Sequence, residues 1–279
     1  MIIDAHQHLW DPARRRYPFL EEPALAPIRR PYTVDDLRAV TDGRVTGTVL
    51  VQTVGERAET EEFLATAATS DGLVRGVVGW VDLTAADVAE QVAELRSGPA
   101  GDRLVGIRHQ VQDEPGRGYL AREDVRRGIR AVGGAGLAYD LLVFTAQLDE
   151  AREVAQALPE VRFVLDHLAK PPIAAGEWEP WAGGVAALAA LPNVTAKLSG
   201  LVIEAVWDDW DVERIGRYAE HALDLFGPDR LMFGSDWPVC TVAARYSDVF
   251  ALGVALTAGL SEPERAAVFA DTATRVYRL

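Results

Sequence analysis

Three features of the sequence predict a (β/α)8 TIM barrel. Eight short segments rich in valine, isoleucine and leucine recur along the chain, and their starts lie 25 to 43 residues apart. Stretches with the apolar spacing of amphipathic helices separate these segments. The length of 279 residues accommodates eight strand–helix units, which together need about 250 residues.

The predicted strands are spread over the whole chain. They cover residues 2–5, 45–52, 73–81, 104–108, 137–143, 162–166, 194–198 and 231–234. Between them, Val88, Val92 and Leu95 share one helix face, and Ser261 opens a capping box before a final predicted helix. A doubly wound open sheet is the alternative. It usually has a glycine-rich phosphate turn after the first strand, where this chain has DAHQHLW.

The chain shows no interior linker, so we expect one domain that spans residues 1–279. The longest predicted loop, residues 10–32, follows the first strand and contains five prolines. Loops of this length in a compact domain often cover an active site. A packed surface excursion explains the same composition equally well.

Composition and charge limit the classes of partner. The chain has 28 basic and 42 acidic residues, a net charge of -14, which disfavours binding to nucleic acid or anionic lipid. The first residues lack the features of a signal peptide, and no run of about 18 apolar residues is present. We therefore expect a cytoplasmic protein that acts on a small molecule, without a membrane partner. A homo-oligomer is possible.

Polar side chains gather where the predicted strands end. In a TIM barrel the carboxyl ends of all strands surround one mouth, whatever their separation in sequence. The strand-end residues, in chain order, are His6, His8, Gln52, Trp80, Asp82, Arg108, His109, Gln110, Asp140, His167, Lys170, Lys197, Ser199 and Asp236. Four of the five histidines of the chain are in this set, which predicts a functional site at the mouth.

The pair His6 and His8 is a candidate for metal binding. Alternate residues of a strand share a face, so both imidazoles can point into the mouth. Together with His167 and Asp236 they offer three nitrogens and one oxygen, a ligand set suited to Zn2+. The pair alone is equally compatible with structural hydrogen bonding.

Asp236 is the candidate catalytic base. Closing a barrel makes the last strand the neighbour of the first, which would place Asp236 beside the two histidines. A carboxylate there can take a proton from water, or from metal-bound water, as the water attacks an electrophile. The alternative is that the side chain caps the turn before Pro238.

The remaining candidates stabilise charge or bind substrate. Arg108 and Lys197 could donate to the anion that forms at a carbonyl, although Arg108 could instead pair with Asp82 or Asp140. Gln52 and Gln110 are candidates for binding hydroxyl groups, and His109 is a further candidate for binding substrate. The aromatic faces of Trp10, Trp80 and Trp237 suit sugar rings, with packing under loops as the alternative.

Five motifs together resemble the amidohydrolase superfamily: DAHQHLWD, VGIRHQVQDEP, FVLDHLAKP, KLSGL and FGSDWPV. The sequence is most similar to the amidohydrolase-related lactonases, which include fuconolactonases, rhamnonolactonases and pyrone-dicarboxylate lactonases. The resemblance implies a distorted barrel in which Asp236 activates water against a lactone carbonyl. It also implies that His6, His8 and His167 bind either a metal or the substrate.

The sequence departs from the superfamily pattern at the fifth strand. Metal-dependent members usually have a histidine there, whereas this chain has LAYDLLVF. We therefore expect a single divalent ion, Zn2+, or a metal-independent reaction, and not a binuclear centre. The alternative functions are a zinc-dependent decarboxylase of the same superfamily and a non-catalytic barrel that binds a small acid.

Overall fold

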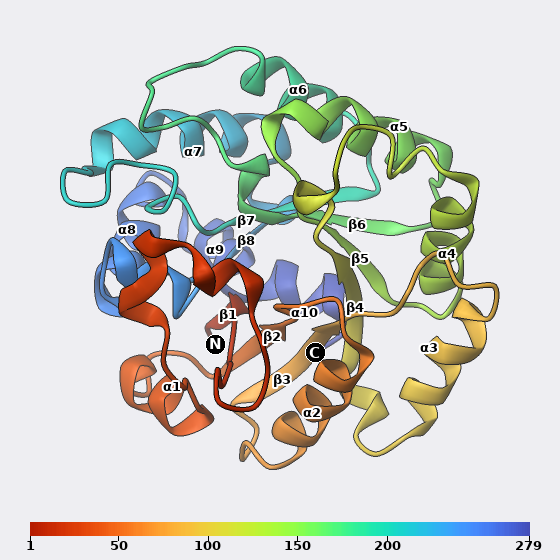
Figure 1. The fold of residues 1–279 in the computed structure, drawn as a ribbon. Helices are drawn as coiled ribbons and strands as arrows, with labels where there is room; N and C mark the ends of the chain where they lie inside the picture. The colour runs from red at the N-terminus through yellow and green to blue at the C-terminus, as the bar shows by residue number, and fades with distance from the viewer.

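A computed structural model describes residues 1–279 and shows an eight-stranded parallel barrel surrounded by helices (Figure 1). The strands pair in chain order, and each lies within or overlaps its predicted segment. They are β1 (Ile3–Gln7), β2 (Gly47–Val51), β3 (Val74–Gly79), β4 (Leu104–His109), β5 (Ala138–Leu141), β6 (Arg162–Leu165), β7 (Val194–Leu198) and β8 (Leu231–Phe233). The predicted fold class is confirmed.

Helices cover the outside of the barrel (Figure 1). They are α1 (Val34–Thr41), α2 (Arg57–Ala68), α3 (Val88–Ser97), α4 (Glu123–Gly134), α5 (Leu148–Ala157), α6 (Trp181–Ala189), α7 (Val212–Phe226), α8 (Tyr246–Leu256), α9 (Glu262–Ala266) and α10 (Thr272–Tyr277). Thr33 and Asp36 form a capping box at the start of α1. No helix is both long and apolar enough to span a bilayer.

The barrel closes irregularly between β8 and β1. The backbone N–H of Asp236 donates to the carbonyl of His6 at 2.8 Å, and that of His8 donates to the carbonyl of Trp237 at 2.7 Å. These bonds lie beyond the end of β8, whose regular part is only three residues long. The junction between β8 and β1 is therefore formed mainly by the segment that carries Asp236.

The C-terminal segment fills the end of the barrel opposite the predicted site. A cluster of 13 buried apolar residues joins strand side chains such as Val49 and Val105 to Ala273, Val276 and Tyr277. The final predicted helix differs from expectation, because a π-helical turn, η9 (Ala267–Asp271), lies between α9 and α10. A larger apolar cluster of 69 buried residues includes side chains of both strands and outer helices.

The long segment between β1 and α1 folds back over the mouth. Trp10 and Tyr32 form a β-bridge at its base, and the segment contains two short 3-10 helices, η1 (Pro18–Glu21) and η2 (Pro23–Ile28). Phe19 and Leu25 from this segment line the pocket described below. The structure thus favours the interpretation of this loop as an active-site cover.

Candidate active site

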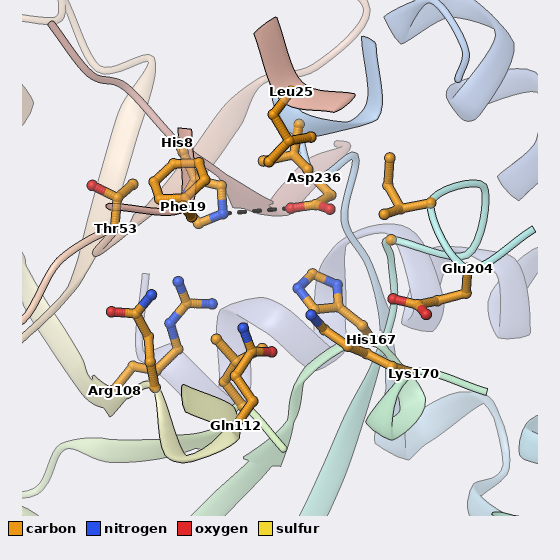
Figure 2. Close-up of a pocket in the computed structure, with 15 residues that line it drawn as sticks. His8, Phe19, Leu25, Thr53, Arg108, Gln112, His167, Lys170, Glu204 and Asp236 are labelled. Carbon is orange, nitrogen blue, oxygen red and sulfur yellow. Dashed lines mark ion pairs between the residues drawn. The ribbon is translucent and has the colours of Figure 1, made fainter. Parts of the chain in front are cut away.

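A pocket of about 200 Å³ opens at the carboxyl ends of the strands (Figure 2). Its polar lining residues are His8, Thr53, Arg108, Gln110, Gln112, His167, Lys170, Glu204 and Asp236. Its apolar side is formed by Phe19, Leu25, Leu142, Ile203 and Val239. The pocket therefore combines charged groups at the strand ends with an apolar cover.

Asp236 points into this pocket. Its backbone is left-handed, with φ 58°, a conformation that aspartate adopts more readily than most residues. Its Oδ1 lies 3.4 Å from Nε2 of His8 and 3.8 Å from Nε2 of His6. The side-chain hydroxyl of Ser235, at 3.0 Å, accepts the backbone N–H of Trp237, so the alternative role of Asp236 as the cap of this turn is not observed.

The charge state of Asp236 suits a base. Burial would raise the pKa of this carboxyl, but the nearby His167 and the hydrogen-bonded His8 outweigh burial and lower it. Asp236 is thus ionised at neutral pH and can accept a proton.

The orientation of His8 is fixed by its second ring nitrogen. Nδ1 lies 2.7 Å from the carbonyl oxygen of Val51, which can only accept, so Nδ1 carries the proton. Nε2 faces Asp236 and lies 3.2 Å from Nε2 of His6; it holds the lone pair when the ring is neutral and donates to Asp236 when the ring is protonated. His8 can accept a hydrogen bond or bind a cation at this atom.

A buried ion network lies directly below His6. Nζ of Lys197 lies 2.7 Å from Asp140, 2.9 Å from Asp166 and 3.1 Å from Nδ1 of His6. Burial raises the pKa of Asp140 to about 6. Burial also opposes ionisation of Asp166, but Lys197, His6 and Arg108 together hold its pKa well below the usual range. Lys197 therefore lies beneath the site and does not line the pocket.

Arg108 has partners other than those considered from the sequence. Its Nη1 donates to Asp166 at 2.9 Å and lies 3.3 Å from Nε2 of His6. Its Nε donates to the side chain of Gln52 at 3.0 Å. Arg108 thus pairs with neither Asp82 nor Asp140. Asp140 forms an ion pair with Lys197 instead. Its guanidinium still lines the pocket, held in place by Gln52 and Asp166.

His167 belongs to a left-handed turn. Residues 167 to 170 all have φ between 51° and 58°, which is unfavourable for residues with a Cβ. Nδ1 of His167 lies 2.8 Å from the hydroxyl of Ser199. Burial lowers the pKa of this histidine to about 4, so the ring is neutral at neutral pH. Its ring nitrogens can therefore accept a proton or bind a cation.

The cluster of His6, His167 and Asp236 can accommodate one cation. One ligand atom from each lies within 4.8 Å of the others, and all three residues are buried. The 3.2 Å between the Nε2 atoms of His6 and His8 is close to the roughly 3.4 Å expected for two nitrogens about 2.1 Å from a tetrahedral ion. Asp166 Oδ1 lies 2.9 Å from Nζ of Lys197 and 3.4 Å from Nδ1 of His6. It can take the Nδ1 proton, which leaves Nε2 free to bind a metal.

Of the residues predicted to bind substrate, Gln110 lines this pocket, whereas Gln52, His109 and the three tryptophans do not. Gln52 is buried and orients Arg108. His109 stacks on Tyr119 and lies 3.1 Å from the indole N–H of Trp80. His109 follows Arg108 on β4 and so points to the opposite side of the strand.

Two of the three predicted rim tryptophans are part of the packing under the cover segment. The indole N–H of Trp10 donates to the carbonyl of Ile28 at 3.2 Å. Trp237 packs edge-on against Tyr32, with ring centroids 5.2 Å apart. Both indoles are buried.

The structure adds three residues that were not predicted for the site. Asp166 and Asp4 are buried acceptors below it, and Glu204 lines the pocket, as does Lys170 from the predicted end of the sixth strand. Asp166 directly precedes His167, so strand alternation predicts opposite directions for the two, but the left-handed turn removes that alternation. Glu204 lies in the irregular segment after β7, where the sequence carries no periodic signal.

Residues 3–279 match the sequence pattern of the amidohydrolase family. The chain belongs to the amidohydrolase family. This amidohydrolase is 38% identical to an L-fucono-1,5-lactonase of Burkholderia multivorans, over 99% of the chain and 96% of that protein. It is 36% identical to an L-fucono-1,5-lactonase of Burkholderia ambifaria, over 99% of the chain and 95% of that protein.

A solved relative has nearly the same fold as this amidohydrolase. The crystal structure of an amidohydrolase from Burkholderia multivorans with bound zinc superposes with a TM-score of 0.92 at 38% identity, covering 100% of this chain and 99% of that one. The resemblance inferred from the five sequence motifs is confirmed.

Proposed function

We propose that this amidohydrolase uses water to open the lactone ring of a sugar acid, of the L-fuconolactone or L-rhamnonolactone type. The observation that carries the proposal is the ionised carboxylate of Asp236 facing the pocket beside His8 and His167. Full-length similarity to two proteins named L-fucono-1,5-lactonase supports the substrate class.

In this proposal Asp236 transfers one proton in each half of the reaction. Its carboxylate takes a proton from water while the water oxygen forms a bond to the lactone carbonyl carbon. The bond between that carbon and the ring oxygen then breaks, and Asp236 returns the proton to the departing oxygen. The product is an open-chain hydroxy acid, which releases one proton to solution at neutral pH.

Fixed positive charge stabilises the carbonyl oxygen as it becomes negative. The guanidinium of Arg108 lines the pocket, and its hydrogen bonds to Gln52 and Asp166 hold it in one orientation. Such preorganised donors contribute more in a partly closed pocket than in water. Lys197 lies beneath the pocket, where its contacts with His6 and Asp166 hold these two side chains in position.

His6, His8, His167 and Asp236 would hold a single divalent ion, with Zn2+ as the best match to three nitrogens and one oxygen. When bound, such an ion polarises a carbonyl oxygen and lowers the pKa of water. The zinc in the Burkholderia multivorans structure supports this part of the proposal. Asp140 on β5 is paired with the ammonium group of Lys197 at 2.7 Å, so its carboxylate is not free to bind a second ion.

Proton release in a pH-stat tests the function. L-Fucono-1,5-lactone, L-rhamnono-1,4-lactone and L-galactono-1,4-lactone form the test panel, and we expect saturable turnover of at least one of them well above spontaneous hydrolysis. If no sugar lactone is opened at any enzyme concentration, the proposal is wrong. Carbon dioxide release from an aromatic acid would then favour the decarboxylase alternative.

Metal removal tests the cofactor part separately. If one ion is bound, metal analysis gives about one equivalent per chain, dialysis against a chelator lowers kcat/KM by roughly 100-fold or more, and Zn2+ restores it. Unchanged turnover by protein shown to be metal-free would mean that the protein residues suffice. Two equivalents of tightly bound metal would contradict the placement of Lys197.

A further inference from the structure

Two charged side chains in the pocket, Lys170 and Glu204, have no role in the proposed reaction. Lys170 follows His167 in the left-handed turn after β6, and Glu204 belongs to the segment after β7. Both line the pocket on the side away from His8 (Figure 2). Figure 2 also shows the Glu204 carboxylate directed toward the region between Lys170, His167 and Asp236.

Glu204 has no partner within the protein. Its carboxylate makes no hydrogen bond, and no Lys, Arg or His nitrogen lies within 4.0 Å of it. Burial raises its pKa, Lys170 lowers it and Asp236 raises it further. A carboxylate that faces the pocket without a donor from the protein can accept hydrogen bonds from a ligand.

Lys170 is likewise free to bind a ligand. Its Nζ lies 4.9 Å from the ring centre of Phe144, and no carboxylate oxygen is within 4.0 Å. The backbone at Lys170 has φ 55° and ends a run of four left-handed residues. This turn brings Lys170 and His167 to the same pocket, although its backbone conformation is unfavourable for residues with a Cβ.

We propose that Glu204 and Lys170 bind the hydroxyl groups of the lactone and thereby select polyhydroxylated rings. A carboxylate can accept from two neighbouring hydroxyls, and an ammonium group donates to a hydroxyl or ring oxygen. Glu204 and Lys170 lie beside Asp236 and His167. They would therefore contact the hydroxyl groups of the lactone ring while the lactone carbonyl lies next to Asp236. The inference rests on the proposed lactonase function and assigns the part of the pocket that chooses the substrate.

Comparing a hydroxylated with an unsubstituted lactone distinguishes an effect on hydroxyl binding from an effect on the reaction itself. We would measure kcat/KM for L-fucono-1,5-lactone and for unsubstituted δ-valerolactone, using wild type, Glu204→Gln and Lys170→Met. The control is Glu177→Gln, because Glu177 is exposed and does not line the pocket. We expect the preference for the hydroxylated lactone to fall by roughly 10- to 100-fold in Glu204→Gln and Lys170→Met, and to stay unchanged in the control.

A second readout does not need turnover. The dissociation constants of the open-chain L-fuconate and of 5-hydroxypentanoate, measured by calorimetry, should lose the same preference in the two pocket variants. If Glu204→Gln fails to fold, judged by loss of its cooperative melt, Lys170→Met carries the test.

Three results would overturn the inference. Equal slowing on both lactones would make Glu204 a general catalytic or structural group, and unchanged preference would mean that neither residue contacts the hydroxyls. Both results leave the lactonase function intact. A wild type that opens no lactone would remove the proposed function and the inference with it.

Discussion

At the scale of single residues, the position of His167 depends on a glycine across the pocket. Gly200 has φ 68°, and a Cβ added there would lie 2.6 Å from Nδ1 of His167. A side chain at residue 200 would therefore displace the imidazole as well as strain the backbone.

Gly200→Ala should lower both stability and activity. We expect the free energy of unfolding to fall by about 1–3 kcal/mol and kcat/KM on the best lactone to fall by roughly 10-fold or more, because His167 moves. Gly43→Ala is the matched control, since Gly43 has φ 69° but nothing within 4 Å of an added Cβ. It should lose stability and keep activity. Equal activity of the two variants would show that His167 tolerates the contact.

Sequence reasoning found the site residues that lie at strand ends and missed those that lie in loops. His6, His8, His167 and Asp236 were found because barrel topology alone brings strand ends together. The sequence places Lys170 at the end of the sixth strand but gives it no role, and it gives no signal for Glu204, because the directions of both side chains depend on a left-handed turn and an irregular segment that have no periodic pattern. Trp10 and Trp237 were expected at the rim on composition, but they pack with Tyr32 beneath the cover segment.

At the scale of elements, hydrogen bonds to Asp4 stabilise the junction between β1 and β8. Its Oδ1 accepts the backbone N–H of Ser235 at 2.8 Å and that of His6 at 3.2 Å, and its Oδ2 accepts the hydroxyl of Tyr246 at 3.1 Å. Burial raises the pKa of Asp4 to about 6, from a usual value of 3.8. Because this carboxyl binds its proton more tightly in the folded state, its contribution to stability is full below pH 3.8 and is lost as pH rises through about 6.

Asp4→Asn should flatten the pH dependence of stability. Asparagine keeps the acceptor for Ser235 and His6 but does not ionise. Between about pH 4.5 and 7.5 we expect the wild type to lose about 2 kcal/mol more of its unfolding free energy than the variant. Urea unfolding at both pH values measures this difference, with exposed Asp224→Asn as the control. Parallel pH profiles for wild type and Asp4→Asn would show that Asp4 does not titrate as the structure implies.

The order and type of most elements followed from hydrophobic periodicity, while their irregular ends did not. The π-helical turn between α9 and α10 lies inside a stretch with uniform helical spacing, so no sequence signal marked it. The 3-10 helices of the cover segment likewise depend on contacts such as the bond from Trp10 to Ile28, which are tertiary.

At the scale of the whole molecule, closure of the barrel creates the site from distant parts of the chain. The bond between Ser235 and Asp4 joins residues 231 positions apart. From the opposite end of the barrel, the hydroxyl of Tyr277 donates to Asp140 at 2.6 Å, and Asp140 in turn holds Lys197 under His6. The catalytic mouth and the C-terminal helix are therefore linked through one buried network.

The central claim is that Asp236 is the base at the junction between β8 and β1, and Asp236→Asn tests it most directly. The change keeps the shape of the side chain and removes its ability to take a proton. On the best lactone we expect kcat to fall by about 10²–10⁴-fold, while the variant still melts cooperatively and binds the product acid. Asp224→Asn should behave as wild type. Turnover by Asp236→Asn within a few-fold of wild type would contradict the account.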